Sequence, residues 1–503
     1  MILISRGIKI DIRNMAAFLI VPEAAGSILA AENGILYINM AGWAEGEEMH
    51  RQIHKQAEVD MIHGPLAKKI FMFALPLAVS SMLQQLFNAA DIAVVGRFTN
   101  AQAMAAVGSN SSVIGLMVNL FTGLAVGANV VVGNLLGANH RSEISRAVHT
   151  IMTVALFSGF FLLLLGNLIA KPILTLMGAP DDVISLAVLY LRIYFCGMPA
   201  MMAYNFGSAV LRSRGDSRRP FGALTFAGVL NVLLNLVFVI GLKMSVAGVA
   251  LATVISNYIS GGLILYFLTH EEDEFRLDFR KLTIRREYLR KMMYIGVPAG
   301  LQGMVFSLSN VVIQSAVNSF GADCIAGMTA AQNFDFISYC LMNGFAQAAL
   351  TFTSQNYGAR DCERCKTVWR LSMAMGLGLD VLLLAVFMLS RHQLIRIFTT
   401  DENVIRYAMY RFEYEVSLHF LCGSYEITAG ALRGLNRSMI PALISVFGTC
   451  LVRLVYVFFI FPRVGTPQFL IMVYPVTWII TSILMNTMYF RVRERAFTQL
   501  GSA

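Results

Sequence analysis

The chain repeats its own sequence pattern, and this repeat constrains the fold more than any other feature. Leu211 and Arg212 recur, without a gap, as Leu432 and Arg433 about 221 residues later. The same lag relates further pairs: Ser217 and Ser438, Pro220 and Pro441, Gly123 and Gly344, Ala125 and Ala346, Gly137 and Gly358, Ala138 and Ala359. Duplicated halves around a midplane cavity are a common design of secondary transporters. The repeat therefore favours a two-lobed transporter.

The composition indicates a membrane protein. Of the 503 residues, 57% are hydrophobic and 14% are charged, and mean hydropathy is +0.64. Soluble domains run near 25% charged residues, so this chain has more apolar surface than a soluble fold could bury. The seven cysteines are scattered and odd in number, which argues against a disulfide framework. Cys362 and Cys365 form a lone C-x-x-C, and we expect no resident metal.

Residues 1–60 differ from the rest of the chain. Residues 2–40 alternate apolar stretches with charges and glycines, without an apolar run of 18 residues or a cleavable signal. We expect a peripheral or disordered extension, and Met49 or Met61 is an alternative start.

Apolar windows of about 20 residues predict twelve transmembrane helices in an all-α polytopic protein. The predicted spans are 70–95, 110–135, 147–168, 184–209, 220–241, 246–268, 292–318, 327–353, 368–389, 404–430, 440–462 and 468–490. We expect a first lobe at 61–270, a linker at 271–291, a second lobe at 292–490 and a tail at 491–503.

The basic residues gather in alternate loops. Loops such as 212–219, 276–291 and 360–370 are rich in arginine and lysine, and so are the segments that flank the first and last spans. Such loops remain cytoplasmic, so both termini should be cytoplasmic. The net charge of +9 then reflects membrane topology, and we expect no nucleic-acid partner.

Asp91 is the strongest candidate functional residue. Ionisable side chains inside a bilayer are costly, so each one is a functional candidate. Helical spacing places Gln84, Asn88 and Asp91 on one face of the first span. A carboxylate with amide neighbours can hold a proton or a sodium ion. Alternatively, Asp91 reaches the interface at the helix end or hydrogen-bonds to a neighbouring helix.

The sequence allows more than one role for the other polar residues within the spans. Asn231 and Asn235 share a face of span five, and with Asn205 at the end of span four they could complete a cation shell or join helices. Second-lobe candidates are Asp335 and Glu426, together with Asp380, and Arg453 could pair with one of the acids; we expect Glu413 and Glu415 at the interface.

An ordered series of motifs lies between Gly64 and Arg495. It includes Gly64-Pro65, Pro76, Gln84-Gln85-Leu86-Phe87-Asn88, Asp91, Val95-Gly96-Arg97, Leu211-Arg212, Gly296-Val297-Pro298-Ala299, Gln355-Asn356-Tyr357-Gly358-Ala359 and Leu432-Arg433-Gly434. In this order the motifs resemble those of bacterial MATE (multidrug and toxic compound extrusion) transporters.

This resemblance implies two six-helix lobes around a cleft, in a bacterial inner membrane. It implies export of organic cations or amphipathic drugs in exchange for protons or sodium ions, without a cofactor and without enzymatic activity. Sodium would bind only transiently. Asp91 matches the family's acidic position in span one, with Asn88 and, more loosely, Asn205 as further coupling candidates. Expected partners are these small molecules and membrane lipids, with the protein a monomer.

The second lobe departs from some members of the family. Their acid in span seven is absent from Val305-Phe306-Ser307, and their span-ten aspartate has no match at Leu421-Cys422-Gly423. Coupling through the first lobe is therefore favoured. The main alternative function is a lipid-linked oligosaccharide flippase of the same superfamily, for which the spans offer few arginines. A membrane enzyme or a channel is a third possible function. The sequence shows no catalytic nucleophile paired with a general base and no phosphate-binding loop, which argues against an enzyme.

Overall fold

The computed structural model describes residues 29–32, 35–38, 59–99, 101–176 and 181–501. The chain divides into two compact units, Met1–Glu58 and Val59–Ala503. In the first unit, β1 (Leu29–Glu32) pairs antiparallel with β2 (Ile35–Ile38). The predicted peripheral or disordered extension comprises residues 1–60. Apart from the two strands and residues 59 and 60, these residues lie outside the described ranges.

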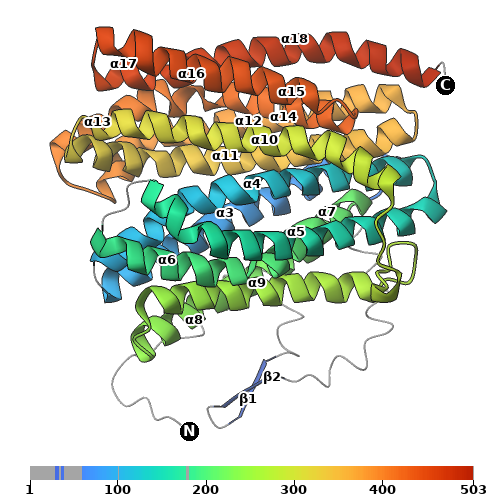
Figure 1. Cartoon of the computed structure of the whole chain (residues 1–503). Coiled ribbons are helices and arrows are strands. Elements are labelled where there is room, and N and C mark those ends of the chain that lie inside the picture. The colour runs from blue at the N-terminus through green and yellow to red at the C-terminus, as the bar shows by residue number, and fades with distance from the viewer. Residues whose placement is uncertain (1–28, 33–34, 39–58, 100, 177–180, 502–503) are drawn as a thin grey trace. The chain divides into compact units, whose positions relative to one another are not determined.

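The second unit is built from helices at the twelve predicted positions (Figure 1). Those of the first lobe are α3 (Leu66–Phe98), α4 (Ala101–Gly137), α5 (Arg141–Leu176), α6 (Asp181–Cys196) with α7 (Met198–Arg214), α8 (Arg218–Asn235) with the π-helical turn η2 (Leu236–Gly241), and α9 (Ser245–Thr269).

The linker holds a 3-10 turn, η3 (Phe279–Lys281), and the second lobe repeats the pattern of the first. Its helices are α10 (Arg286–Asn318), α11 (Ala322–Gly358), α12 (Cys362–Arg396), α13 (Glu402–Tyr414) with η4 (Val416–Leu418) and α14 (His419–Gly434), α15 (Met439–Ser445) continued by η5 (Val446–Leu451), α16 (Val452–Val455), η6 (Tyr456–Ile460) and η7 (Phe461–Arg463), and α17 (Pro467–Ile471) with α18 (Val473–Gly501).

Most of these helices are long enough and apolar enough to span a membrane. Within the described residues, nine helices are long and apolar enough to cross a bilayer, and α6 with α7 forms a tenth span bent by 48°. The remaining two segments, α11 and α13–α14, carry many polar side chains and are not among these spans. Polar spans of this kind normally face a protein interior rather than lipid.

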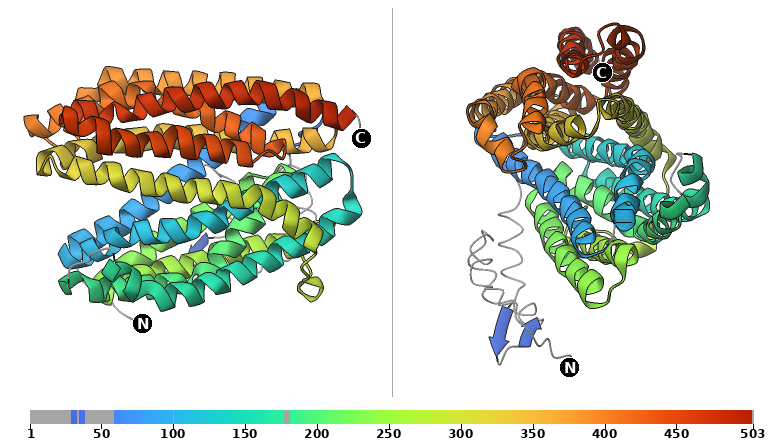
Figure 2. Two further views of the ribbon diagram at one scale, coloured as in Figure 1. Left: turned by 45° about the horizontal axis from the view of Figure 1, so that its top comes forward. Right: turned by 90° about the vertical axis from the view of Figure 1, so that its left-hand side faces the viewer.

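The first helix of each lobe crosses to the other lobe. In α3, Ile70 and Phe73 pack with Phe352 of α11, whereas the later Asp91 contacts α8 and α9. In α10, Met292 packs into the core of the first lobe, while its later residues pack in the second. Figure 2 shows α3 in blue and α10 in yellow where the green helices meet the orange-to-red helices. Movement of the lobes must therefore also move α3 and α10.

The lobes meet closely at the end that carries the basic loops. A side chain on Gly137 would overlap Gln355 of α11, and one on Gly358 would overlap Asn134 of α4, so glycine allows the backbones to touch. Asn134 also donates to Asn436 Oδ1 at 2.7 Å. Farther along, Gly123 of α4 lies against the backbone of α10. This end of the interface is closed.

Buried ion pairs hold the linker against the first lobe at the same end. Arg219 pairs with Asp216 and donates to Glu271 Oε1 at 2.6 Å, while Arg214 reaches Glu271 Oε2 at 2.8 Å. Asp216 and Glu271 are both buried. Part of the charge of the linker is thus paired and buried.

Candidate functional site: a cavity between the lobes

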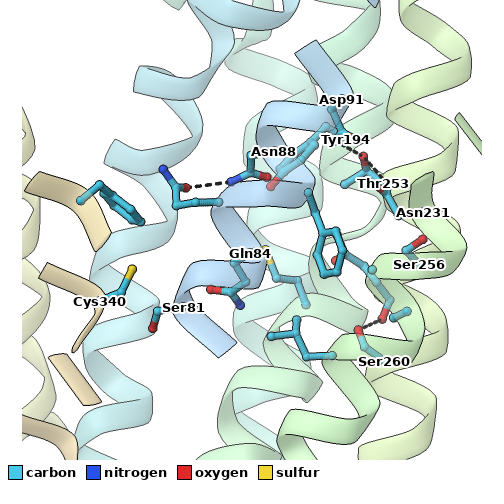
Figure 3. Close-up of a pocket in the computed structure, with 18 of the residues that line it drawn as sticks. Ser81, Gln84, Asn88, Asp91, Tyr194, Asn231, Thr253, Ser256, Ser260 and Cys340 are labelled. Carbon is cyan, nitrogen blue, oxygen red and sulfur yellow. Dashed lines mark hydrogen bonds between the residues drawn. The ribbon is translucent and has the colours of Figure 1, made fainter. Parts of the chain in front are cut away.

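A cavity of about 370 Å³ lies between the two lobes. Its walls come from α3, α7, α8 and α9, with Tyr194 of α6, and from α11 on the opposite side (Figure 3). The lining residues are Ser81, Gln84, Gln85, Phe87, Asn88, Asp91, Tyr194, Met201, Leu224, Ala227, Gly228, Asn231, Thr253, Ser256, Asn257, Ser260, Phe336, Tyr339, Cys340 and Asn343.

Asp91 lies at the centre of a hydrogen-bond network that joins three helices. Asn235 of α8 donates to Asp91 Oδ1 at 2.5 Å, and Thr253 of α9 donates to Oδ2 at 3.2 Å. Asn231 accepts from Asn235 Nδ2 at 3.3 Å and donates to Thr253 Oγ1 at 3.3 Å. Asp91 is only 6% exposed. Among the described residues, the side chains that donate to this buried carboxylate are neutral.

The local structure of α8 positions these amides. Asn231 and Asn235 are one turn apart, and the helix changes to π geometry directly after Asn235. Single π-helical turns inside α-helices are frequent at functional sites. Asn235 Oδ1 is buried and accepts no hydrogen bond from the described residues. An oxygen acceptor is therefore free beside the carboxylate.

The structure gathers most of the sequence-predicted residues of the first lobe. Gln84, Asn88, Asp91 and Asn231 all line the cavity, and Asn235 lies behind them in the same network. These contacts fit the interhelical alternative as well as a coupling role. Asn205 is different, because its amide donates to Met201 O in its own helix and does not line the cavity.

Thr253 is a member of this network that sequence reasoning missed. A hydroxyl group in a membrane helix costs little free energy, whereas an ionisable group costs much more. Thr253 therefore does not stand out in the sequence as Asp91 does. The one available clue was its position within span six.

The lining has one formal charge. Among the described residues around the cavity, Asp91 is the only acid, and arginine and lysine are absent. The remaining surface combines amides and hydroxyls with aromatic side chains such as Phe336 and Tyr339. This arrangement suits a cation with an apolar body better than an anion.

The second-lobe candidates lie elsewhere. Asp335 and Asp380 belong to a buried cluster around His419, and Glu426 is half-buried in α14 outside the cavity lining. Two expectations about this lobe are wrong. Glu415 is not interfacial, because it is 1% exposed and pairs with Arg411 at 2.8 Å.

The second correction concerns Arg453. Its guanidinium donates to Asn310 Oδ1 at 2.8 Å and stacks over the rings of Phe306 and Tyr474. Within the described part of the chain, no carboxylate lies in ion-pair range of Arg453. Aromatic rings and amides therefore stabilise this buried charge in place of the expected acid.

Twelve helical segments in two lobes, with a polar cavity between them, define a multi-pass membrane transporter. The sequence model of the MatE family matches residues 76–237 and again 298–459, so each lobe carries one copy. The chain belongs to the MatE family, whose members are transporters and not enzymes.

Known proteins agree with this assignment. The chain is 28% identical to the probable multidrug resistance protein YoeA of Bacillus subtilis, over 76% of this chain and 84% of that protein. It is 22% identical to an FAD transporter of Shewanella oneidensis, over 76% and 86% of the two chains. The structure of an outward-facing multidrug resistance MATE transporter superposes with a TM-score of 0.78 at 21% identity, covering 87% of this chain and 97% of that one.

Proposed function

We propose that the protein exports organic cations or amphipathic drugs in exchange for protons or sodium ions. The single observation that carries this proposal is the cavity between the lobes, in which Asp91 is the only formal charge among the described lining residues. Relatives described as probable multidrug resistance proteins, such as YoeA, support drug-like cargo.

Asp91 would exchange its cargo by charge neutralisation. An unneutralised buried carboxylate is unfavourable, so either a coupling ion or a cationic drug stabilises it, and the arrival of one favours release of the other. A proton would bind the carboxylate directly. Sodium would find oxygen ligands at Asp91, Asn231, Asn235 and Thr253, because hard cations prefer oxygen donors.

Movement of the lobes would expose the cavity to the two sides of the membrane in turn. The backbone contacts at Gly137 and Gly358 close the end with the basic loops, which we place in the cytoplasm with both termini. The opposite end would then open outward. The glycine contacts must separate before drug can enter from the cytoplasm.

Transport of an anion is the second candidate, because an FAD transporter is among the relatives and a lipid-linked oligosaccharide flippase is a related possibility. Both cargoes carry phosphates, which normally require arginine, lysine or backbone N–H donors. The described cavity lining offers Asp91 instead. Its charge would repel such cargo.

Accumulation of a fluorescent organic cation in everted membrane vesicles tests the proposal. Proton and sodium gradients are imposed separately, with FAD as an anionic comparison cargo. We expect one of the two gradients to drive cation accumulation and neither to drive FAD. Driven FAD transport without cation transport contradicts the assignment.

A further inference from the structure

A short segment before α3, residues 59–65, contacts both lobes at the end that carries the basic loops. On the first lobe, the backbone N–H of Val59 donates to Gly215 O at 3.3 Å, in the turn between α7 and α8. On the second lobe, Asn356 Nδ2, near the end of α11, donates to Met61 O at 3.1 Å. The segment therefore crosses from one lobe to the other.

The attachment to the second lobe is extensive. Arg364 of α12 donates to Met61 O and to Gly64 O, with distances of 3.3 Å. Its Nε also donates to Asn356 Oδ1 at 3.1 Å. Met61 is 1% exposed and packs in one hydrophobic cluster with Phe352 of α11. Hydrogen bonds from a charged guanidinium are stronger than those between neutral groups. The segment is therefore bound firmly to α11 and α12.

Hydrogen bonds within the segment hold it in one shape. Asp60 Oδ1 accepts from the backbone N–H groups of Ile62 and His63 at 3.0 and 3.1 Å. Lys69, in the first turn of α3, donates to His63 O at 2.6 Å. Gly64 turns the chain into α3 with a left-handed φ of 69°. The segment should therefore move as one unit with the start of α3, which itself packs on the second lobe.

The contact with the first lobe is small by comparison. Gly215 has a left-handed φ of 107°, and a Cβ added to it would lie 2.4 Å from Val59 O and 3.0 Å from Val59 N. Glycine thus allows the backbone of the segment to lie directly on the turn. Within the described residues, one backbone hydrogen bond joins the two. A contact of this size can form and break as the lobes move.

The second copy of the repeat has a side-chain contact at the equivalent turn. The residue 221 positions after Gly215 is Asn436, which is also left-handed, with a φ of 61°. Asn134 of the first lobe donates to its Oδ1 at 2.7 Å. The turn after α14 therefore contacts the opposite lobe through a side chain, whereas the turn after α7 does so through residues 59–65. Both contacts belong to the closed end of the interface.

We propose that residues 59–65 form a latch, which moves with the second lobe and holds this end of the cavity closed by packing on Gly215. Opening at this end breaks the bond between Val59 and Gly215 and leaves the bonds from Asn356 and Arg364 intact. The opening rests on the lobe movement proposed above, whereas the attachment of the latch to the second lobe does not.

Distances between spin labels show which lobe the latch follows. A label at His63 is paired with one at Arg218 of the first lobe or at Glu363 of the second, all of them exposed. A third pair, Arg218 with Met439, reports separation of the lobes. The protein is measured in nanodiscs at acidic and neutral pH, with and without an organic cation.

Where the lobe pair gains a longer distance component, we expect the pair of His63 and Arg218 to gain it in the same proportion. The pair of His63 and Glu363 should keep one distance. A longer component between His63 and Glu363 instead overturns the proposal. Lobes that never separate, in a protein that transports, contradict the lobe movement of the proposed function.

Two substitutions should release the latch from the first lobe by different means. Gly215→Ala places a methyl group against the backbone of Val59, and Arg364→Ala removes donors that bind the latch to the second lobe. Each should raise the population with separated lobes by about 2- to 10-fold, as expected for loss of one backbone hydrogen bond. In Arg364→Ala, the distance between His63 and the second lobe should also broaden.

Each substitution has a matched control. Gly321→Ala imposes a similar backbone strain, at a φ of 89°, but its added Cβ meets no atom within 4 Å. Arg370→Ala removes an exposed arginine from the helix that carries Arg364. Both controls should keep the distance distribution of the unmodified protein. If Gly215→Ala or Arg364→Ala folds and also keeps that distribution, the latch does not hold the lobes closed and the proposal is overturned.

Discussion

Gly123→Ala should weaken the closed arrangement of the lobes. Gly123 of α4 packs against α10, and an added Cβ would overlap the backbone of Gly300 and lie 2.8 Å from Gly296 O. The neighbours are backbone atoms, so relief requires the two helices to separate by about 1 Å. Overpacking of this kind costs about 1–3 kcal/mol. The gain in helix propensity from alanine is the same in both conformations and cancels.

This cost falls only on the conformation in which the helices touch. It should therefore shift the equilibrium toward separated lobes by about 5- to 150-fold. Electron resonance between spin labels at Arg218 and Met439, exposed positions of the two lobes near the basic-loop end, measures that shift. A longer distance component should appear or grow.

Gly115→Ala is the matched control, because it lies on the same helix and its added Cβ meets no atom within 4 Å. Its distance distribution should equal that of the unmodified protein. If Gly123→Ala also leaves the distribution unchanged, the glycine contact does not hold the lobes together.

Three further substitutions test separate parts of the structure. Arg219→Ala leaves two buried carboxylates with one partner fewer and should cost about 3–5 kcal/mol in unfolding free energy, whereas Lys291→Ala, at an exposed pair, should cost less than about 1 kcal/mol. Asn343→Lys adds a cation to the cavity wall and should abolish binding of organic cations, measured by fluorescence titration, while the protein stays folded. Asn235→Leu removes a hydrogen bond of about 1.5–3 kcal/mol to the carboxylate of Asp91 and should alter the pH profile of drug transport; an unchanged profile means that this bond has no part in coupling.

Ten of the twelve helical segments could be predicted from sequence because they carry a local apolar pattern, whereas α11 and α13–α14 carry many polar side chains and fall short of it. The clustering of Gln84, Asn88 and Asp91 was likewise predictable, since helical spacing fixes which residues share a face. Thr253 could not be found this way, because its approach to Asp91 depends on how α3 packs against α9.

The second lobe shows the same limit. Asp335 and Asp380 stood out as costly acids, but pairing with His419 requires three helices to meet. Arg411, Glu415 and His419 are spaced four residues apart, a signal of helical neighbours that the sequence did contain. That spacing would have placed Glu415 beside Arg411, but the burial of the pair depends on tertiary packing and could not be predicted from it.

The central claim is that Asp91 couples ion entry to drug export. Its most direct test is drug uptake by proteoliposomes under an imposed ion gradient, comparing the unmodified protein with Asp91→Asn. Asp401→Asn is the control, since asparagine can still cap α13 there. We expect Asp91→Asn to fold, insert and lose gradient-driven uptake, with Asp401→Asn unaffected. Undiminished gradient-driven uptake by Asp91→Asn contradicts the claim.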